Sequence, residues 1–339
     1  MTFFSVIGYK NFVNYIPHRH YDGFGLSSKA VLGIKEKYNP SLIITIDCGT
    51  VDLEAIKLAK DNKIDVIVTD HHEPKAELPE AVAIVNPKVG NTYPFTGLCG
   101  AGVVFKLIQA LIARGNFSIP SGVEKWWLDM VGVATIADMV PLRDENRVFA
   151  LYGLKVLRKT RRPGLQKLLR KQKIDPQYLS EDDIGFTIGP RINAASRMDN
   201  PEDAFLLLAT KDEDEAEMRV LHLEKLNTER KATVALMTKE AHKRLELLEE
   251  VPKVLVFGSP SWRPSLVGLV ANKLAEEYNR PAFLWGRDGN GMLKGSCRSG
   301  GDVSVVRLME ATPEIFHEFG GHHMSGGFTV KEEEVHFFF

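Results

Sequence analysis

The chain has 339 residues, of which 44% are hydrophobic and 26% are charged, and its formal net charge is −1 at pH 7. These values are typical of a soluble globular protein, and they exclude a chain that is basic throughout or that contains a membrane-spanning apolar run. The three cysteines, Cys48, Cys99 and Cys297, are far apart and odd in number, which argues against a zinc site and favours the cytoplasm. A chain of this length can bury two cores, so we expect two domains.

The first elements in chain order predict a parallel βαβ unit. Short β-branched runs at 42–46 and 64–69 indicate strands, and the polar, Gly-free stretch 51–63 between them indicates a helix. Asp47 follows the first strand, and Asp70, His71 and His72 follow the second. Because parallel strands end at the same edge of a sheet, we expect these side chains to lie near one another, where open α/β sheets bind ligands.

A carboxylate and an imidazole at this edge are a mixed oxygen and nitrogen ligand set, which suits Mn²⁺ or Mg²⁺. From these residues alone a plainer reading is also open. An Asp at the end of a strand is often only the N-cap of the next helix, and a His pair is often structural. The rest of the chain has to decide between the two readings.

Strand-like and helical stretches alternate to about residue 209, including a Gly-rich turn into a helix at 97–107. Within 151–174 the chain carries nine basic residues and no acidic one, a segment that we call the basic track. Its members are Lys155, Arg158, Lys159, Arg161, Arg162, Lys167, Arg170, Lys171 and Lys173. Such a block is either a phosphate-contacting surface or a solvated helix face, and the sequence leaves both open.

The segment 211–250 contains neither Gly nor Pro and predicts one long helix of about 60 Å at 1.5 Å per residue. A new α/β pattern follows Pro252, with strands at 254–257 and 282–285 and a helix at 267–278. We therefore expect three parts, namely an α/β domain with a parallel sheet at 1–209, a connecting helix at 210–250 and a smaller α/β domain at 251–339.

Eight short motifs appear in the order seen in the DHH phosphoesterases. They occupy residues 45–49, 70–72, 85–87, 99–103, 137–142, 188–197, 295–299 and 320–323. Each motif alone is weak, but together they cover nearly the whole chain. The sequence therefore resembles the DHH family, and in particular its single-strand-specific exonucleases, and the resemblance implies a DHH catalytic domain joined to a DHHA1-type substrate-binding domain.

The resemblance implies a phosphodiesterase that uses two Mn²⁺ or Mg²⁺ ions. By motif position, Asp47, His71 and Asp138 resemble metal ligands. Asp70 then orients the histidines, and His72 lies near the substrate phosphate, which makes these two the catalytic candidates. The alternative for Asp138 is an ordinary strand-end or helix-cap Asp, but its Ala-Asp-Met-Val-Pro setting favours the ligand role.

Six further residues are candidates for contact with the substrate. They are Arg191, Ser296, Arg298, Gly320, Gly321 and His322. An Arg can hold a phosphate with two donors, and a Gly pair can offer backbone N–H groups. The alternatives are an Arg191 that pairs with Asp182 or Asp183, and glycines that only form turns.

The family's first Asp-rich motif, which the resemblance assigns to both metal ions, has no match in this sequence. We therefore expect a chain that is truncated at both ends, with an exposed sheet edge and weak or no activity unless the missing strand is supplied.

The resemblance implies a 5′-to-3′ exonuclease specific for single-stranded DNA, acting in DNA repair and recombination. Its expected partners are single-stranded DNA and replication or repair proteins such as a helicase or a single-strand-binding protein, with no membrane. Two alternatives remain, namely a phosphodiesterase for short oligonucleotides or cyclic dinucleotides, and a catalytically silent protein that binds single strands. The basic track favours a polymer, and retention of Asp47, His71, His72 and Asp138 argues against a silent site.

Overall fold

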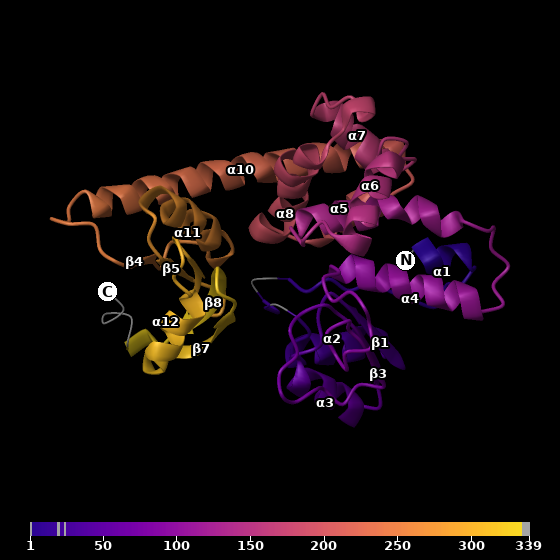
Figure 1. Cartoon of the computed structure of the whole chain (residues 1–339), viewed down its shortest axis with the longest axis horizontal. Coiled ribbons are helices and arrows are strands. Elements are labelled where there is room, and N and C mark those ends of the chain that lie inside the picture. The colour runs from indigo at the N-terminus through magenta and orange to yellow at the C-terminus, as the bar shows by residue number, and fades with distance from the viewer. Residues whose placement is uncertain (1, 19–20, 24, 334–339) are drawn as a thin grey trace. The chain divides into compact units, whose positions relative to one another are not determined.

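A computed structural model describes residues 2–18, 21–23 and 25–333, which form two compact units (Figure 1). Unit 1 contains most residues up to 193 together with 201–223, and unit 2 contains mainly 194–200 and the residues from 224 onward. Among the described residues, no helix has both the length and the apolar composition that crossing a bilayer requires. The domain boundaries expected from the sequence stay predictions, and 334–339 lie outside the described residues.

The sheet of unit 1 has three parallel strands in the order β1 (Leu42–Ile46), β2 (Asp65–Thr69) and β3 (Ala83–Val85). Helices α2 (Ser28–Tyr38) and α3 (Leu53–Asp61) share an apolar core with it, whereas α1 (Thr2–Val6) contacts Phe117 and Trp127 through Phe3. Strands β1 and β2 pair from Leu42 opposite Asp65 to Ile46 opposite Thr69, so both end at one level. This register confirms the predicted parallel βαβ unit, and it places Asp47 beside the segment that begins at Asp70.

The remainder of unit 1 is helical. Its elements are α4 (Gly100–Arg114), the 3₁₀ turn η1 (Val123–Trp127), α5 (Leu128–Ala137), α6 (Asp144–Leu157), α7 (Pro163–Lys171), η2 (Pro176–Tyr178), the π-helical turn η3 (Asp183–Ile188), α8 (Gly189–Met198) and α9 (Glu202–Ala209). The expectation that strands and helices alternate to residue 209 is therefore wrong beyond Val85 in the described chain. A buried helix such as α5 is apolar on most sides, and its composition resembles that of a buried strand.

Helices α5 and α6 approach each other closely at two glycines. A Cβ on Gly132 would lie 2.7 Å from the Cα of Gly153 and 3.0 Å from the backbone oxygen of Phe149. No side chain larger than hydrogen fits between the two backbones at this crossing. The contact fixes α5, whose C-cap residue is Asp138.

Helix α10 (Glu213–Leu245) is the long helix predicted from the sequence, but it is shorter than expected at 33 residues, or about 50 Å. It starts late because the side chain of Asp212 caps it, accepting a hydrogen bond of 2.7 Å from the backbone N–H of Glu215. It ends at Leu245, before the turn that leads to Pro252. The prediction from the absence of Gly and Pro therefore made the helix too long at both ends.

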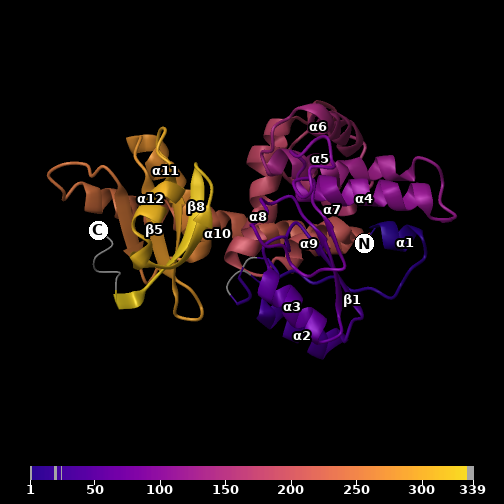
Figure 2. The ribbon, with the colours of Figure 1, turned by 60° about the horizontal axis from the view of Figure 1, so that its bottom comes forward.

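Unit 2 is a five-stranded mixed sheet in the order β4, β5, β6, β8, β7, with helices on both faces (Figures 1 and 2). The strands are β4 (Leu255–Ser259), β5 (Ala282–Arg287), β6 (Leu293–Arg298), β7 (Phe316–Gly321) and β8 (Ser325–Val330), and the helices are α11 (Pro264–Tyr278), α12 (Val305–Ala311) and the short η4 (Pro313–Ile315). The sequence correctly predicted β4, β5 and α11 within three residues at each end.

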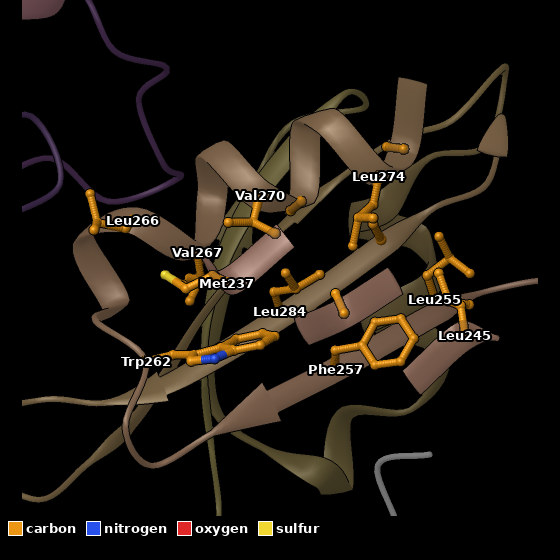
Figure 3. Close-up of a cluster of buried hydrophobic side chains, with 14 residues drawn as sticks. Met237, Leu245, Leu255, Phe257, Trp262, Leu266, Val267, Val270, Leu274 and Leu284 are labelled. Carbon is orange, nitrogen blue, oxygen red and sulfur yellow. The ribbon is translucent and has the colours of Figure 1, made fainter. Parts of the chain in front are cut away.

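Two apolar cores enclose the sheet of unit 2. One joins α11, β4, β5 and residues of α10 such as Met237 and Leu245, and its side chains interlock in Figure 3. The other core includes Phe283 of β5, Met309 of α12 and Phe328 of β8. Successive residues of β5 alternate between the two cores, which is why this strand is an unbroken apolar run rather than an alternating one.

Candidate functional site

Asp47 is held in an unusual backbone conformation directly after β1. Its φ is 64°, in the left-handed region, and its backbone N–H donates to the carbonyl of Thr69 over 2.9 Å. The first residue of α4, Gly100, packs against its side chain so tightly that a Cβ there would lie 2.7 Å from the Cβ of Asp47. The carboxylate therefore lies at the N-terminal end of α4, where unpaired N–H groups favour negative charge.

His71 joins the two carboxylates of the site. Its Nε2 lies 3.0 Å from Oδ1 of Asp47 and 3.7 Å from Oδ2 of Asp138. Asp138 is the C-cap residue of α5, so one of these three side chains comes from the end of a helix and the other two follow strands. Burial raises the pKa of Asp138; His71 opposes this effect, and the charge of Asp47 adds to it. A cation at this position would relieve the repulsion between the two carboxylates.

Asp70 is the buried anchor of the histidine pair, with 1% of its surface exposed. It accepts hydrogen bonds from the backbone N–H groups of Thr50 and His71 over 3.0 and 2.7 Å, and it contacts Nδ1 of His72 over 2.7 Å. Burial alone would raise the pKa of Asp70, but the hydrogen bonds from His72 and Thr50 hold it well below its usual range. The hydrogen bond to Asp70 raises the pKa of His72.

We predict that the Asp70 and His72 pair contributes most to the free energy of unfolding between about pH 4 and pH 6.5, measured in chelator. The folded pKa of Asp70 is depressed, so its contribution is lost as the pH falls through the acidic range. The folded pKa of His72 is raised, so its contribution is lost as the pH rises through that value. Replacing Asp70 with Asn should flatten both limbs and cost about 2 kcal/mol near pH 5, because an amide cannot accept from every donor.

Urea unfolding at a series of pH values measures this effect. The matched control is Asp61→Asn, at an exposed carboxyl of α3. Equal pH profiles for wild type and Asp70→Asn would contradict the assigned hydrogen bonds.

The donor set fits a divalent cation. Ligands at adjacent corners of an octahedron with bonds of about 2.1 Å lie about 3 Å apart, close to the separation of His71 and Asp47. Asp47, His71 and His72 also form a group whose ligand atoms all lie within 4.8 Å of one another. Because Nδ1 of His72 is taken up by Asp70, only Nε2 of this ring is available to a ligand. Hard oxygen ligands with an imidazole favour Mn²⁺ or Mg²⁺ over a thiol-preferring metal.

The substrate candidates of unit 2 meet at one end of its sheet. Ser296 of β6 lies opposite Gly327 of β8, which lies opposite Gly320 of β7, and Arg298 lies opposite Ser325. The two residues that continue this row beyond Ser296, Gly327 and then Gly320, present backbone instead of side chains.

Nη1 of Arg298 donates a hydrogen bond of 2.7 Å to the backbone carbonyl of Cys297. Burial lowers the pKa of Arg298. Nε2 of His322 lies 2.9 Å from Oγ of Ser325, and its Nδ1 accepts from the backbone N–H of Met324 over 3.3 Å. His322 therefore bonds within its own hairpin, a role that the sequence did not indicate.

Arg191 lies in unit 1, at the start of α8. It is 8% exposed, and its Nη1 donates to the carbonyl of Thr187 over 2.9 Å. Gly189 of the same helix packs beside Ala137 at the end of α5, since a Cβ there would be 3.8 Å from that side chain. Arg191 therefore belongs to the segment that packs next to Asp138.

Sequence reasoning missed three residues that support the site, namely Thr50, Asn86 and Gly100. Asn86 is buried, and its amide donates to the hydroxyl of Thr50 and to the carbonyl of His72, each over 2.9 Å. Gly100 makes room for Asp47. Asn86 and Gly100 both fall in the recognised motifs, so the signal was present, but their roles need the third dimension.

Comparison with known proteins identifies two domains. The DHH family, N-terminal domain, matches residues 2–135, and the DHHA1 domain matches residues 251–338. The single-stranded-DNA-specific exonuclease RecJ of Bacillus subtilis is 41% identical over 95% of this chain and 40% of its own length. RecJ of Escherichia coli is 34% identical over 98% of this chain and 60% of its own length. The chain thus spans about half the length of such curated relatives.

Solved structures agree in fold. A manganese complex of RecJ from Thermus thermophilus has a TM-score of 0.80 and 31% identity, covering 92% of this chain and 45% of the other. A second manganese-bound exonuclease RecJ has a TM-score of 0.78 and 31% identity, covering 96% of this chain and 79% of the other. These matches confirm the expected α/β architecture with a parallel sheet and a second sheet domain.

Proposed function

This chain belongs to the DHH family, among its RecJ-type members, and on that premise we propose that it is a metal-dependent exonuclease that degrades single-stranded DNA from the 5′ end. The observation that carries the proposal is the convergence of Asp47, His71 and Asp138 at the carboxyl edge of a parallel sheet. Its role would be in DNA repair and recombination.

Asp47, His71 and Asp138 would hold Mn²⁺ or Mg²⁺. When bound, such an ion activates a water molecule for attack and stabilises charge on the scissile phosphate. The solved RecJ relatives that contain manganese or magnesium support this choice of metal. We propose that a second ion of the same kind binds at this site.

Asp70 and His72 would act on the phosphate. Asp70 holds His72 by Nδ1, which leaves Nε2 as the ring nitrogen available to a substrate, and the raised pKa of His72 favours the protonated ring. A protonated Nε2 can donate to a phosphate oxygen or to the leaving group. Asp70 acts by positioning, since it is buried and bonded to the protein.

The remaining substrate contacts are proposed within each unit. In unit 2, Ser296, Arg298, Gly320, Gly321 and His322 would contact the sugar–phosphate backbone, since their strands meet at one end of the sheet. Arg191 would do so in unit 1, next to the end of α5. These contacts carry no base information, which fits an enzyme that degrades any single strand.

We also propose a cytoplasmic location, which the three free thiols of Cys48, Cys99 and Cys297 support. Protein partners would include a helicase or a single-strand-binding protein, which is the setting in which single strands arise.

The test is incubation of the chain with 3′-labelled single-stranded DNA, with duplex DNA and with a cyclic dinucleotide, each with Mn²⁺ and with chelator. The expected result is slow, Mn²⁺-dependent loss of nucleotides from the 5′ end of the single strand only, because Asp47, His71 and Asp138 are present whereas the family's first Asp-rich motif has no match. Asp138→Ala is the control that should remove it. Faster hydrolysis of the cyclic dinucleotide would replace the proposal by the small-substrate alternative, and binding without any hydrolysis would replace it by the silent one.

A further inference from the structure

Three exposed aromatic rings lie beside basic side chains in the helical part of unit 1. Trp126 of η1 is 42% exposed, Tyr152 of α6 is 48% exposed and Tyr178 of η2 is 75% exposed. The guanidinium carbon of Arg161 is 4.4 Å from the centre of the Trp126 ring, and Nζ of Lys155 is 4.8 Å from the centre of the Tyr152 ring. A single exposed ring needs no explanation, but aromatic rings set among basic side chains are typical of a binding surface for single-stranded nucleic acid.

Tyr178 is connected to the same region through Arg158. The guanidinium of Arg158 donates from Nη2 and Nε to the carbonyl of Leu179 over 2.9 and 3.2 Å, directly next to Tyr178 in the chain. Two of the three rings therefore lie under a cation of the segment between Tyr152 and Arg161, and the third is tied to the same segment through the backbone of Leu179.

The charge of this region is only partly neutralised. Two of the nine residues of the basic track are paired with acids: Arg162 with Asp129 over 2.7 Å, and Lys167 with Glu213 and Glu217 over 3.6 and 3.5 Å. The other seven are exposed: Lys155, Arg158, Lys159, Arg161, Arg170, Lys171 and Lys173. The sequence left open whether this track is a solvated helix face, and the stacked aromatic rings favour a binding surface.

Positive charge combined with aromatic rings selects for unpaired bases. Lysine and arginine contact phosphates, and a free base can stack on an indole, a phenol or a guanidinium plane. A duplex hides the faces of its bases inside the stack, and an acidic peptide offers charge without bases. A single strand is the polymer that uses both properties of the surface.

We propose that Trp126, Tyr152, Tyr178 and the seven exposed basic residues form a second binding surface for single-stranded nucleic acid, which we call the aromatic–basic surface. Trp126 lies just before the N-terminal end of α5, whereas Asp138 lies at its C-terminal end, so the length of this helix, about 15 Å, separates Trp126 from this proposed metal ligand. The inference rests on the proposed function only in naming the same polymer, because binding here needs neither metal nor hydrolysis.

Intrinsic fluorescence provides a direct test, because Trp126 is the one exposed tryptophan of the four. Trp127, Trp262 and Trp285 are 8%, 3% and 6% exposed. We would titrate the chain with an oligothymidylate of about 20 nucleotides in chelator, where no strand is cut. The expected result is saturable quenching of the exposed emission, which Trp126→Phe removes.

Affinity measured by anisotropy of a labelled strand gives the second readout. Trp126→Leu should weaken binding by about 10-fold, since one stacking platform is lost. The double variant Lys155→Gln and Arg161→Gln should lower the slope of log K against log salt by about 1.4, at about 0.7 for each charge. Lys57→Gln, at an exposed lysine of α3, is the matched control and should leave the affinity unchanged.

Two outcomes would overturn the proposal. One is an affinity and salt slope that stay at wild-type values in the Trp126 and double variants. The other is quenching by a polyglutamate peptide at least as strong as that by the oligonucleotide, which would make this an acidic-peptide site. Since all measurements are made in chelator, an absence of nuclease activity would refute the proposed function without affecting this result.

Discussion

Replacing Gly100 with alanine is expected to lower the affinity for Mn²⁺ by at least about 100-fold and to reduce cleavage to the level of Asp138→Ala, although every proposed ligand is still present. The new methyl group would lie 2.7 Å from the Cβ of Asp47 and closer still to its carboxylate. Asp47 cannot retreat by a small adjustment, because its backbone is already held at a φ of 64°. The side chain must rotate toward solvent and lose its 3.0 Å contact with His71.

Gly102→Ala is the matched control for this prediction. Gly102 lies two residues further along α4, and a Cβ there would be 3.4 Å from the ring of Phe149 and 3.6 Å from Leu98, which are ordinary contacts. Titration calorimetry with Mn²⁺ and a single-strand cleavage assay should separate the two variants, and circular dichroism should show that both are folded. Equal Mn²⁺ affinities for Gly100→Ala and wild type would refute the position assigned to Asp47.

The cluster of candidate metal ligands could be predicted from the sequence because most of it is local. Two strands joined by one helix favour parallel pairing, which brings their carboxyl ends to one edge, so the proximity of Asp47 and His71 follows from short-range rules. Asp138 did not follow from such rules. It caps a helix whose position depends on the contact between Gly132 and Gly153, and only the family resemblance indicated it.

The less predictable features depend on contacts between distant segments. In unit 2, β8 lies between β6 and β7, an order that brings Ser296, Gly327 and Gly320 into one row. This strand order cannot be predicted from the hydrophobic periodicity of the sequence. The helices of unit 1 were partly mistaken for strands for a related reason, because burial on several sides removes the amphipathic pattern that distinguishes a helix.

The aromatic–basic surface could be predicted only in part from the sequence. Its charge was visible in the sequence as a run without acids, but charge alone could not separate a binding surface from a solvated one. In the structure, Arg162 and Lys167 form ion pairs with acidic residues and are therefore not part of the surface. Trp126 lies outside the basic track in sequence, but its ring lies against Arg161. The sequence therefore predicted where the basic residues lie along the chain, and the packing determines which of them are available to bind a ligand.

Replacing Gly132 with alanine is expected to lower the free energy of unfolding by about 3 kcal/mol, the largest loss of stability that we predict for a single methyl group. The added Cβ would meet the Cα of Gly153 at 2.7 Å and the carbonyl of Phe149 at 3.0 Å. Both are backbone atoms, so no rotamer change can relieve the contact, and α5 and α6 must move apart. Because α5 ends at Asp138, the affinity for Mn²⁺ should fall as well.

Gly33→Ala makes the comparison decisive, because the same substitution should there have the opposite sign. Gly33 is exposed within α2, and a Cβ on it would meet nothing within 4 Å. Alanine restricts the unfolded chain and favours the helix, so stability should rise by about 0.5–1 kcal/mol. Urea denaturation of both variants measures the difference. A destabilisation below about 1 kcal/mol for Gly132→Ala would mean that the two helices cross with more space than the glycine contact implies, and that the position of Asp138 is set by another part of unit 1.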